Sequence, residues 1–413
     1  MKFNTNFKKN AAILIGNLLD HYDFYIYTLL APYIAHVFFI SDSMLISLIK
    51  AYGIVHVSII TRPLGAAFFG RFAGSIGPIK ALRYCLIGVA CSTFLIGILP
   101  GYNQLGSLAA ILLLILRAFQ SFCSSGEGAI AGLYILSGNP KRRSFFGSMY
   151  GFSTLLGMLM ASKICEIVSQ SSNPDLYWRL AFILGFTTSL VGIYIRTTKY
   201  QLANYTAQTQ QNVSTIIKIN YSKIIRIAIL SAFSYISAPI CFVIINALVP
   251  LLQHVTISKM IVLNTYLLMF DGIMIIVSGY ILSFVKIEKF LLYCSFLVLI
   301  SQIVLLWIIP FASLQSIMII RIMLITFGVP FAIALKIWLA NITDTQGQEK
   351  YFITALGTGM GIEILGRTII VGAFYIFGLY KNFTVLIAYV ICLYLAAIYC
   401  LLSYPTNLHN LKK

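Results

Sequence analysis

Five carboxylates lie within long apolar runs of this sequence: Asp20, Asp23, Glu127, Asp271 and Glu363. A charged side chain in hydrocarbon costs roughly 2.5–3.5 kcal/mol on insertion scales, so it normally faces a protein interior or a wet cavity. Carboxyl groups that are removed from water but reachable from it can bind and release protons. Asp20, Asp23, Glu127 and Asp271 therefore predict a path for protons or a polar solute, with Asp20, Asp23 or Glu127 as the proton carrier.

Two arginines in apolar runs, Arg117 and Arg321, add positive charge to this pattern. A guanidinium binds a carboxylate through paired hydrogen bonds, so Arg117 is predicted to attract the carboxylate of a solute. Tyr22 and Gln120 lie close to these charges in the sequence and are assigned to the same path. Arg117 and Glu127 are ten residues apart, about 15 Å along a helix and roughly 80° around it, so they are not expected to pair.

Each of these assignments has a structural alternative. Asp20 or Asp23 could sit at a wet helix end and pair with a nearby base, and Arg117 and Glu127 could each form a buried ion pair with another span. Asp271 could form a hydrogen bond between helices, and the choice between the two roles stays open for Arg321.

Glu363 and Arg367 are four residues apart on one helix face. Side chains at this spacing are neighbours, so the two are predicted to form a structural pair.

The composition places these residues in a membrane protein. The chain has 413 residues, of which 60% are hydrophobic and only 10% charged, and its mean hydropathy is +0.92. A water-soluble globule with this balance would need an apolar surface. The net charge of +18 comes from short basic clusters between apolar runs, which fits the positive-inside rule and not nucleic-acid binding. The cysteines and histidines have no metal-ligand spacing, and no cofactor or metal is expected.

Twelve apolar runs are long enough to cross a bilayer, for which about 20 residues suffice. The predicted spans are 11–39, 46–72, 81–99, 107–137, 144–168, 177–196, 224–252, 260–284, 290–309, 314–340, 351–379 and 383–403. The basic loops alternate with loops poor in base, which puts both termini in the cytoplasm. The first run contains acids and is followed by no cleavage site, so it is predicted to be a retained span.

A polar interval at 198–222 divides the chain into an N-terminal bundle, 1–197, and a C-terminal bundle, 223–413. Arg117 and Arg321 fall in the fourth span of their halves, and such repeats are typical of a large class of transporters. The fold class is therefore an all-α membrane protein with two six-helix bundles.

Small residues and prolines mark where these helices pack and bend. The runs 151–162 and 357–361 are predicted to be helix-packing surfaces. Pro32, Pro239 and Pro330 could kink their spans.

Four segments in order resemble the major facilitator superfamily, and within it the metabolite:proton symporter family of proline/betaine and dicarboxylate transporters. They are GNLLDHYDFYIY (16–27), RPLGAAFFGRFAGSIGPIKAL (62–82), RAFQSFCSSGEGAIAGLYIL (117–136) and YWRLAFILG (177–185). The resemblance is good over residues 10–196 and vague after 223.

The chain departs from that family's loop motif. Gly74 stands where the motif has an aspartate, and Pro78 where it has an arginine. Separately, Ser137, near the cytoplasmic end of the fourth span, stands where the family has a glutamate. In the family these charges hold the halves together on the cytoplasmic side, so the resemblance implies a weaker latch here. Arg62 and Gly70, in the same segment, are assigned structural or gating roles.

The resemblance implies proton-coupled symport of a small solute by alternating access in a bacterial inner membrane. Its expected partners are the solute, protons and the lipid bilayer, without nucleic acid. A zwitterion such as proline or betaine is the first candidate solute, and a di- or tricarboxylate is the second. Two other classes remain: a degenerate, non-transporting sensor or binding protein, and a membrane enzyme acting on lipid. The enzyme is disfavoured because no cluster of His, Asp or Ser gathers near one membrane face.

Overall fold

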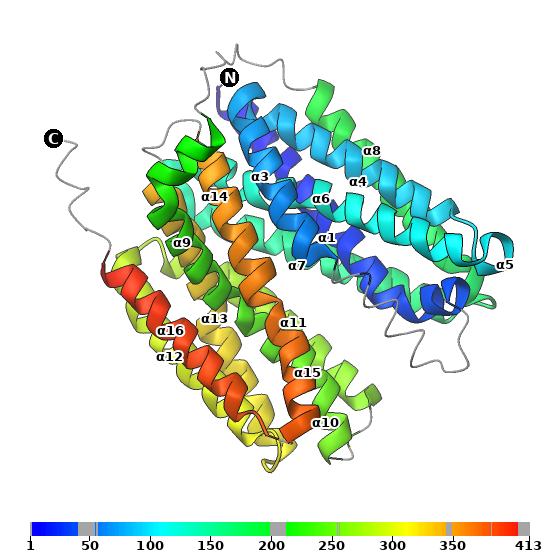
Figure 1. The fold of residues 1–413 in the computed structure, drawn as a ribbon. Coiled ribbons are helices and arrows are strands. Elements are labelled where there is room, and N and C mark those ends of the chain that lie inside the picture. The colour runs from blue at the N-terminus through cyan, green and yellow to red at the C-terminus, as the bar shows by residue number, and fades with distance from the viewer. Residues whose placement is uncertain are drawn as a thin grey trace. The chain divides into compact units, whose positions relative to one another are not determined.

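The computed structural model describes residues 2–39, 54, 57–198, 212–253, 255, 257–343, 349–380 and 382–403 (Figure 1). Over these residues the chain is helical and contains no strand. The helices of the first part are α1 (Lys2–Phe38), α3 (Ser58–Ile76), α4 (Pro78–Ile98), α5 (Tyr102–Leu105), α6 (Ser107–Gly138), η1 (Pro140–Arg142), α7 (Arg143–Ser169) and α8 (Pro174–Thr198). Those of the second part are α9 (Val213–Ala238), η2 (Pro239–Ile244), α10 (Ile245–Gln253), α11 (Ile257–Ile281), α12 (Ile287–Ile308), α13 (Leu314–Thr343), α14 (Lys350–Gly359), η4 (Met360–Gly366), α15 (Thr368–Tyr380) and α16 (Thr384–Leu402).

Each predicted span contains a helix, which confirms the all-α class. In hydrocarbon every backbone polar group must be satisfied internally, and a helix does this within one segment. Nine helices among the described residues are long and apolar enough to cross a membrane by length and composition. The start of the second span and most of the predicted linker lie outside the described residues.

Two predicted spans are not continuous α-helices. The seventh runs from α9 through η2 into α10, and the eleventh from α14 through η4 into α15, and both η2 and η4 are π-helical. Pro239 opens η2, so the distortion predicted there takes the form of a π-helical turn. Pro330 lies within the continuous helix α13, and nothing is described of the Pro32 side chain.

By their contacts the residues group into two compact units. The first contains 1–138, 149–216 and 345–359, and the second contains 139–148, 217–344 and 360–413. The boundary predicted at 198–222 stays a prediction.

In the first unit, α6 is a central helix. It packs on α1, α3, α4 and α14, while α8 packs on α1 and α4. Figure 1 shows α4 and α8 running alongside each other.

Aromatic side chains fix α1 against α8. Trp178 lies edge-on to Phe38 and to Phe182, with ring centroids 6.0 and 5.5 Å apart, and Phe182 meets Tyr27 at 6.5 Å. All four side chains are fully buried. Edge-to-face aromatic pairs stabilise packing beyond the area they bury. This cluster therefore fixes the position of α1 along the axis of α8.

Glycines allow the closest helix contacts in this unit. A Cβ on Gly157 would lie 2.2 Å from the backbone oxygen of Leu18, and one on Gly65 would lie 2.1 Å from that of Phe122. Helices α1 and α7, and α3 and α6, thus meet backbone to backbone. This confirms 151–162 as a packing surface.

In the second unit, α13 packs on α11, α12 and η2, and α16 packs on α12 and α15. A Cβ on Gly361 of η4 would lie 2.1 Å from the backbone oxygen of Ala228 on α9. The 357–361 run therefore also allows a close helix approach, as predicted.

Candidate functional site

Three helices of the first unit share a buried polar cluster centred on Arg117. Arg117 of α6 donates to Oε1 of Gln120, one turn further along the same helix. Gln120 in turn donates from Nε2 to Oγ1 of Thr93 on α4, at 2.7 Å. Arg117 and Gln120 are each only 3% exposed and Thr93 is fully buried. The chain of contacts fixes the guanidinium on the inner face of the bundle.

Tyrosines of α1 hold the other side of this cluster. The guanidinium carbon of Arg117 lies 3.9 Å from the ring centroid of Tyr27. A desolvated cation over an aromatic face is stabilised by about 2 kcal/mol. Tyr22 donates from its hydroxyl to the backbone oxygen of Ala181 on α8, at 2.9 Å. Arg117 and Gln120 are therefore in contact, and Tyr22 lies with Asp23 and Thr93 around Gly185. The assignment of Tyr22, Arg117 and Gln120 to one path stays a prediction.

Asp23 lies beside the same cluster and is only 2% exposed. Its two carboxylate oxygens form no hydrogen bond that meets normal geometry within the described part of the chain. The groups that act on it electrostatically are Asp20, Arg117 and the Thr93 hydroxyl. A Cβ at position 185 of α8 would lie 2.4 Å from Oδ1 of Asp23, so Gly185 leaves the space that the carboxylate occupies. A buried, weakly hydrogen-bonded carboxyl close to a second carboxyl has the chemistry of a proton-binding group.

Asp20 is buried on the same helix, three residues before Asp23. One turn earlier, Nδ2 of Asn17 approaches α7 at three oxygens: Ser153 Oγ (2.8 Å), Thr154 Oγ1 (2.9 Å) and Tyr150 O (3.2 Å). The amide nitrogen has two hydrogens for these three acceptors, so the bonds are shared. Asn17 fixes the rotation of α1 and hence the direction in which Asp20 and Asp23 point.

We expect Asn17→Ala to lower the free energy of unfolding by about 1–2 kcal/mol, because hydrogen bonds between membrane helices contribute roughly 0.6 kcal/mol each and up to about 1.7. Ser92→Ala is the matched control, since Ser92 is equally buried but donates only within its own helix. Reversible denaturant unfolding in micelles measures both. Equal losses in the two variants would contradict the role of Asn17.

Arg62 of α3 and Glu127 of α6 lie near Ser124 of α6. Nη2 of Arg62, on α3, donates to Oγ of Ser124 at 3.1 Å, and its guanidinium carbon is 4.9 Å from the ring centroid of Phe24. Glu127 is 1% exposed and lies one turn beyond Ser124. Arg62 thus bridges α3, α6 and α1, which agrees with a structural role, and that role stays a prediction.

The residues of the degenerate loop motif lie where α3 ends and α4 begins. A Cβ on Gly70 would lie 2.9 Å from Phe352 Cα and from Tyr351 O of α14. Gly77 adopts φ 95°, a conformation that favours glycine, and Pro78 follows at the first turn of α4. Gly74 is buried and Ser137 partly buried. Close backbone approach characterises this end of α3 at Gly70, and the gating role stays a prediction.

In the second unit Arg321 is fully buried on α13. Its Nη2 donates to Oδ1 of Asn246 at 3.0 Å and to Oδ1 of Asn264 at 2.9 Å. Asp271, on α11, is partly buried. None of the sequence patterns singled out Asn246 or Asn264, which lie on α10 and α11.

The ion pair expected between Glu363 and Arg367 is present at 2.8 Å and nearly buried. The Arg367 guanidinium also lies 5.8 Å from the ring centroid of Tyr235 on α9. This pair holds η4 and α15 to α9, in agreement with a structural role.

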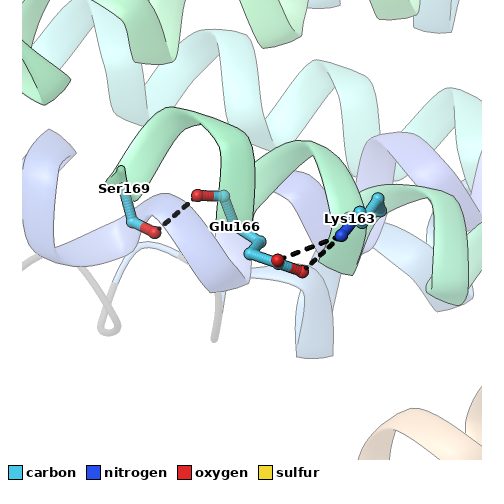
Figure 2. A network of polar contacts seen from close by, with 3 residues as sticks. All are labelled: Lys163, Glu166 and Ser169. Atoms are coloured by element: carbon cyan, nitrogen blue, oxygen red, sulfur yellow. Dashed lines mark hydrogen bonds and ion pairs between the residues drawn. The ribbon is translucent and has the colours of Figure 1, made fainter. Parts of the chain in front are cut away.

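A contrasting polar group lies near the end of α7 (Figure 2). Nζ of Lys163 is 3.0 Å from both carboxylate oxygens of Glu166, and Ser169 donates to the backbone oxygen of Glu166 at 2.8 Å. The side chains of Lys163 and Glu166 are 68% and 51% exposed. An exposed pair contributes little to stability, so Glu166 is a suitable control residue for the buried acids.

The helical spans and the charged side chains buried between them define a multi-pass membrane protein. The family model of the Major Facilitator Superfamily matches residues 13–362, and the chain belongs to this superfamily. The predicted resemblance is thereby confirmed.

Several curated transporters resemble the chain. A glycine betaine/proline/ectoine/pipecolic acid transporter of Dickeya dadantii is 31% identical over 194 residues, which are 46% of this chain and 39% of that protein. An α-ketoglutarate permease of Escherichia coli is 30% identical over 186 residues, 44% of this chain and 43% of the permease. A putative proline/betaine transporter of Staphylococcus aureus is 32% identical over 238 residues, 55% of this chain and 49% of that protein. The chain therefore covers less than half the length of these relatives.

Solved structures share the fold over nearly the whole chain. A proton:xylose symporter bound to 6-bromo-6-deoxy-D-glucose gives a TM-score of 0.77 at 12% identity, covering 98% of this chain and 97% of the other. The fucose:proton symporter of Escherichia coli gives 0.72 at 13%, covering 97% and 100%. At this identity the likeness shows the fold alone.

Proposed function

We propose that this protein is a secondary active transporter that couples the uptake of a small solute to protons by alternating access. The observation that carries the proposal is the buried cluster of Asp23, Thr93, Gln120 and Arg117 on three helices of the first unit. A buried acid and base joined by neutral hydrogen-bonding groups are expensive in a membrane protein, and such groups mark ion and solute paths.

In this mechanism Arg117 attracts the carboxylate of the solute, and Asp23 takes up the proton. A proton on Asp23 cancels a negative charge close to Arg117 and frees the guanidinium for an external anion. Proton and solute binding then favour one another, which is the requirement for symport. Asp20 and Glu127 are the other carriers to be tested.

A zwitterion such as proline or betaine is the first candidate solute, because relatives named as transporters of these compounds match 46% and 55% of the chain. A di- or tricarboxylate is the second, supported by the α-ketoglutarate permease. Both classes carry the carboxylate that Arg117 would bind.

Uptake by proteoliposomes tests the proposal. Purified protein should accumulate at least one of labelled proline, glycine betaine or α-ketoglutarate when the outside is acidic, and a protonophore should remove the accumulation. Absence of flux for all three and for related organic acids, with and without the gradient, would overturn it.

Glu127→Gln should abolish proton-driven accumulation while leaving solute exchange, if Glu127 carries the proton. Glu166→Gln is the matched control, because Glu166 is an exposed acid on α7 whose pairing with Lys163 is superficial. Accumulation in Glu127→Gln at the control level would remove Glu127 from the coupling path and leave Asp20 and Asp23.

The loss of charges at three positions supports a second candidate, a sensor or binding protein that does not transport. Gly74, Pro78 and Ser137 stand where the family has charges. A protein that binds a solute in solution and yet shows no flux in liposomes would be of this kind.

The proposed location is the bacterial inner membrane with both termini in the cytoplasm, and the proposed bundles are 1–197 and 223–413, joined by 198–222. Alkaline phosphatase fused after residue 413 should be inactive in this orientation, since the enzyme works only outside the cytoplasm. An active fusion would reverse the topology.

A further inference from the structure

The second unit contains a buried guanidinium, that of Arg321, which forms no ion pair with a carboxylate among the described residues. Arg321 is 0% exposed, and its partners are amide oxygens of Asn246 and Asn264, the sulfur of Met318 and the neighbouring Cys241 thiol. Asp271, seven residues beyond Asn264 on α11, makes no ion pair with Arg321 in the described part of the chain. A cation held only by neutral dipoles attracts an anion strongly at low local dielectric.

Some N–H groups of Arg321 and Asn264 lack a strong hydrogen-bond acceptor among the described residues. Nε of Arg321 is buried and has no hydrogen-bond partner among the described residues, and Nη1 donates to the weakly accepting sulfur of Met318 at 3.7 Å. The amide oxygen of Asn264 must face the guanidinium, because a guanidinium offers donors alone. Its Nδ2 is therefore turned away from Arg321, and no acceptor takes it within the described part of the chain.

The two asparagines hold the group in different ways. Asn246 also donates from Nδ2 to the backbone oxygen of Phe242, at 2.8 Å, so it is tied to its own helix. Asn264 is only partly buried and carries the free donor. Asn246 thus positions Arg321, while Asn264 can contact a ligand.

We propose that Arg321 and Asn264 form an anion site that takes the carboxylate of an organic acid or amino-acid-like solute, with Asn246 as a positioning residue. A guanidinium matches a carboxylate with two parallel hydrogen bonds, and the Asn264 amide adds a third donor. The full burial of Arg321 restricts the site to a small anionic group. This inference rests on the proposed function for its ligand class, but binding can be measured without transport.

The test measures thermal unfolding of the purified full-length chain with α-ketoglutarate, proline and glycine betaine, each against a form without the free carboxylate: the dimethyl ester, prolinamide and choline. At least one acid should raise the unfolding temperature of the wild-type protein in a saturable way, and its matched form without the carboxylate should not. Absence of stabilisation by any of the acids would overturn the proposal.

Asn264→Asp gives the sharpest variant. Its carboxylate would lie where Oδ1 now accepts from Arg321 at 2.9 Å, so it supplies the missing negative charge internally. Affinity for the acid should fall at least tenfold while the protein without ligand unfolds at the same temperature or higher. Arg321→Gln should also lose affinity for the acid at least tenfold. If Arg321→Gln fails to fold, the affinity of Asn264→Asp tests the anion site.

Gln302→Met is the matched control, since Gln302 is equally buried in this unit but donates to Ser237 and is not among the hydrogen-bond partners of Arg321 in the described part of the chain. It should keep wild-type affinity. Wild-type affinity in folded Asn264→Asp and Arg321→Gln would overturn the anion site.

Transport assays separate this inference from the proposed function. Arg321-dependent binding without any flux would support the site and count against transport. Proton-driven flux that Asn264→Asp leaves unchanged would support transport and overturn the site.

Discussion

Asp23→Asn is expected to abolish proton-driven accumulation of the solute while leaving exchange across the membrane. With one proton coupled and a gradient of one pH unit, the wild-type protein can concentrate a neutral solute about tenfold, since one pH unit corresponds to about 1.36 kcal/mol. Asparagine has nearly the same shape but binds no proton, so the internal concentration should only equal the external one.

The position of Asp23 makes this a large effect. Its carboxylate fills the space left by Gly185 and lies within electrostatic range of Arg117, so the variant removes the negative charge without opening a cavity. Proteoliposome uptake under an imposed gradient and counterflow without one give the two readouts. Asp175→Asn is the control, because Asp175 is a half-exposed acid paired with His36 at 2.9 Å. A tenfold accumulation in Asp23→Asn would show that the proton binds elsewhere.

Gly157→Ala is expected to destabilise the protein by about 2 kcal/mol. Its new Cβ would lie 2.2 Å from the backbone oxygen of Leu18 and 3.1 Å from Cβ of His21, and both belong to the rigid helix α1. Overpacking of this kind costs about 1–3 kcal/mol, of which the better helix propensity of alanine returns only about 0.5–1 kcal/mol. Denaturant unfolding in micelles measures the change.

Gly128→Ala provides a control of opposite sign. Gly128 is also in a membrane helix of the first unit, but a Cβ there would meet nothing within 4 Å. Alanine should therefore leave stability unchanged or raise it by up to about 1 kcal/mol. Equal effects of the two substitutions would show that α1 and α7 are not in backbone contact.

The helices could be predicted because each follows from a local property, a run of apolar residues long enough to cross a bilayer. Local spacing also predicted the ion pair of Glu363 with Arg367, whose partners lie four residues apart on one helix. The π-helical turns were not predictable from that pattern. Pro239 marks one of them, but Pro330 lies in the middle of an unbroken helix.

The partners of the buried charges required the tertiary structure. The sequence identified Arg117 and Arg321 as unusual because a charge in an apolar run is costly wherever it lies. Thr93 is 27 residues from Gln120, and Asn264 is 57 residues from Arg321. Polar side chains of this kind are common in membrane helices, so only the packing of one helix on another shows which of them meet a charge.

The π-helical turn η4 has a further mechanical meaning. Within it the backbone N–H of Arg367 donates to the oxygen of Ile362, five residues back, at 2.8 Å. Returning to the ordinary four-residue ladder would remove one residue from the turn, which rotates all that follows by about 100° and moves it by about 1.5 Å along the axis. A change of η4 from π-helix to α-helix would therefore rotate and shift α15, while the other turns of the eleventh span stay helical.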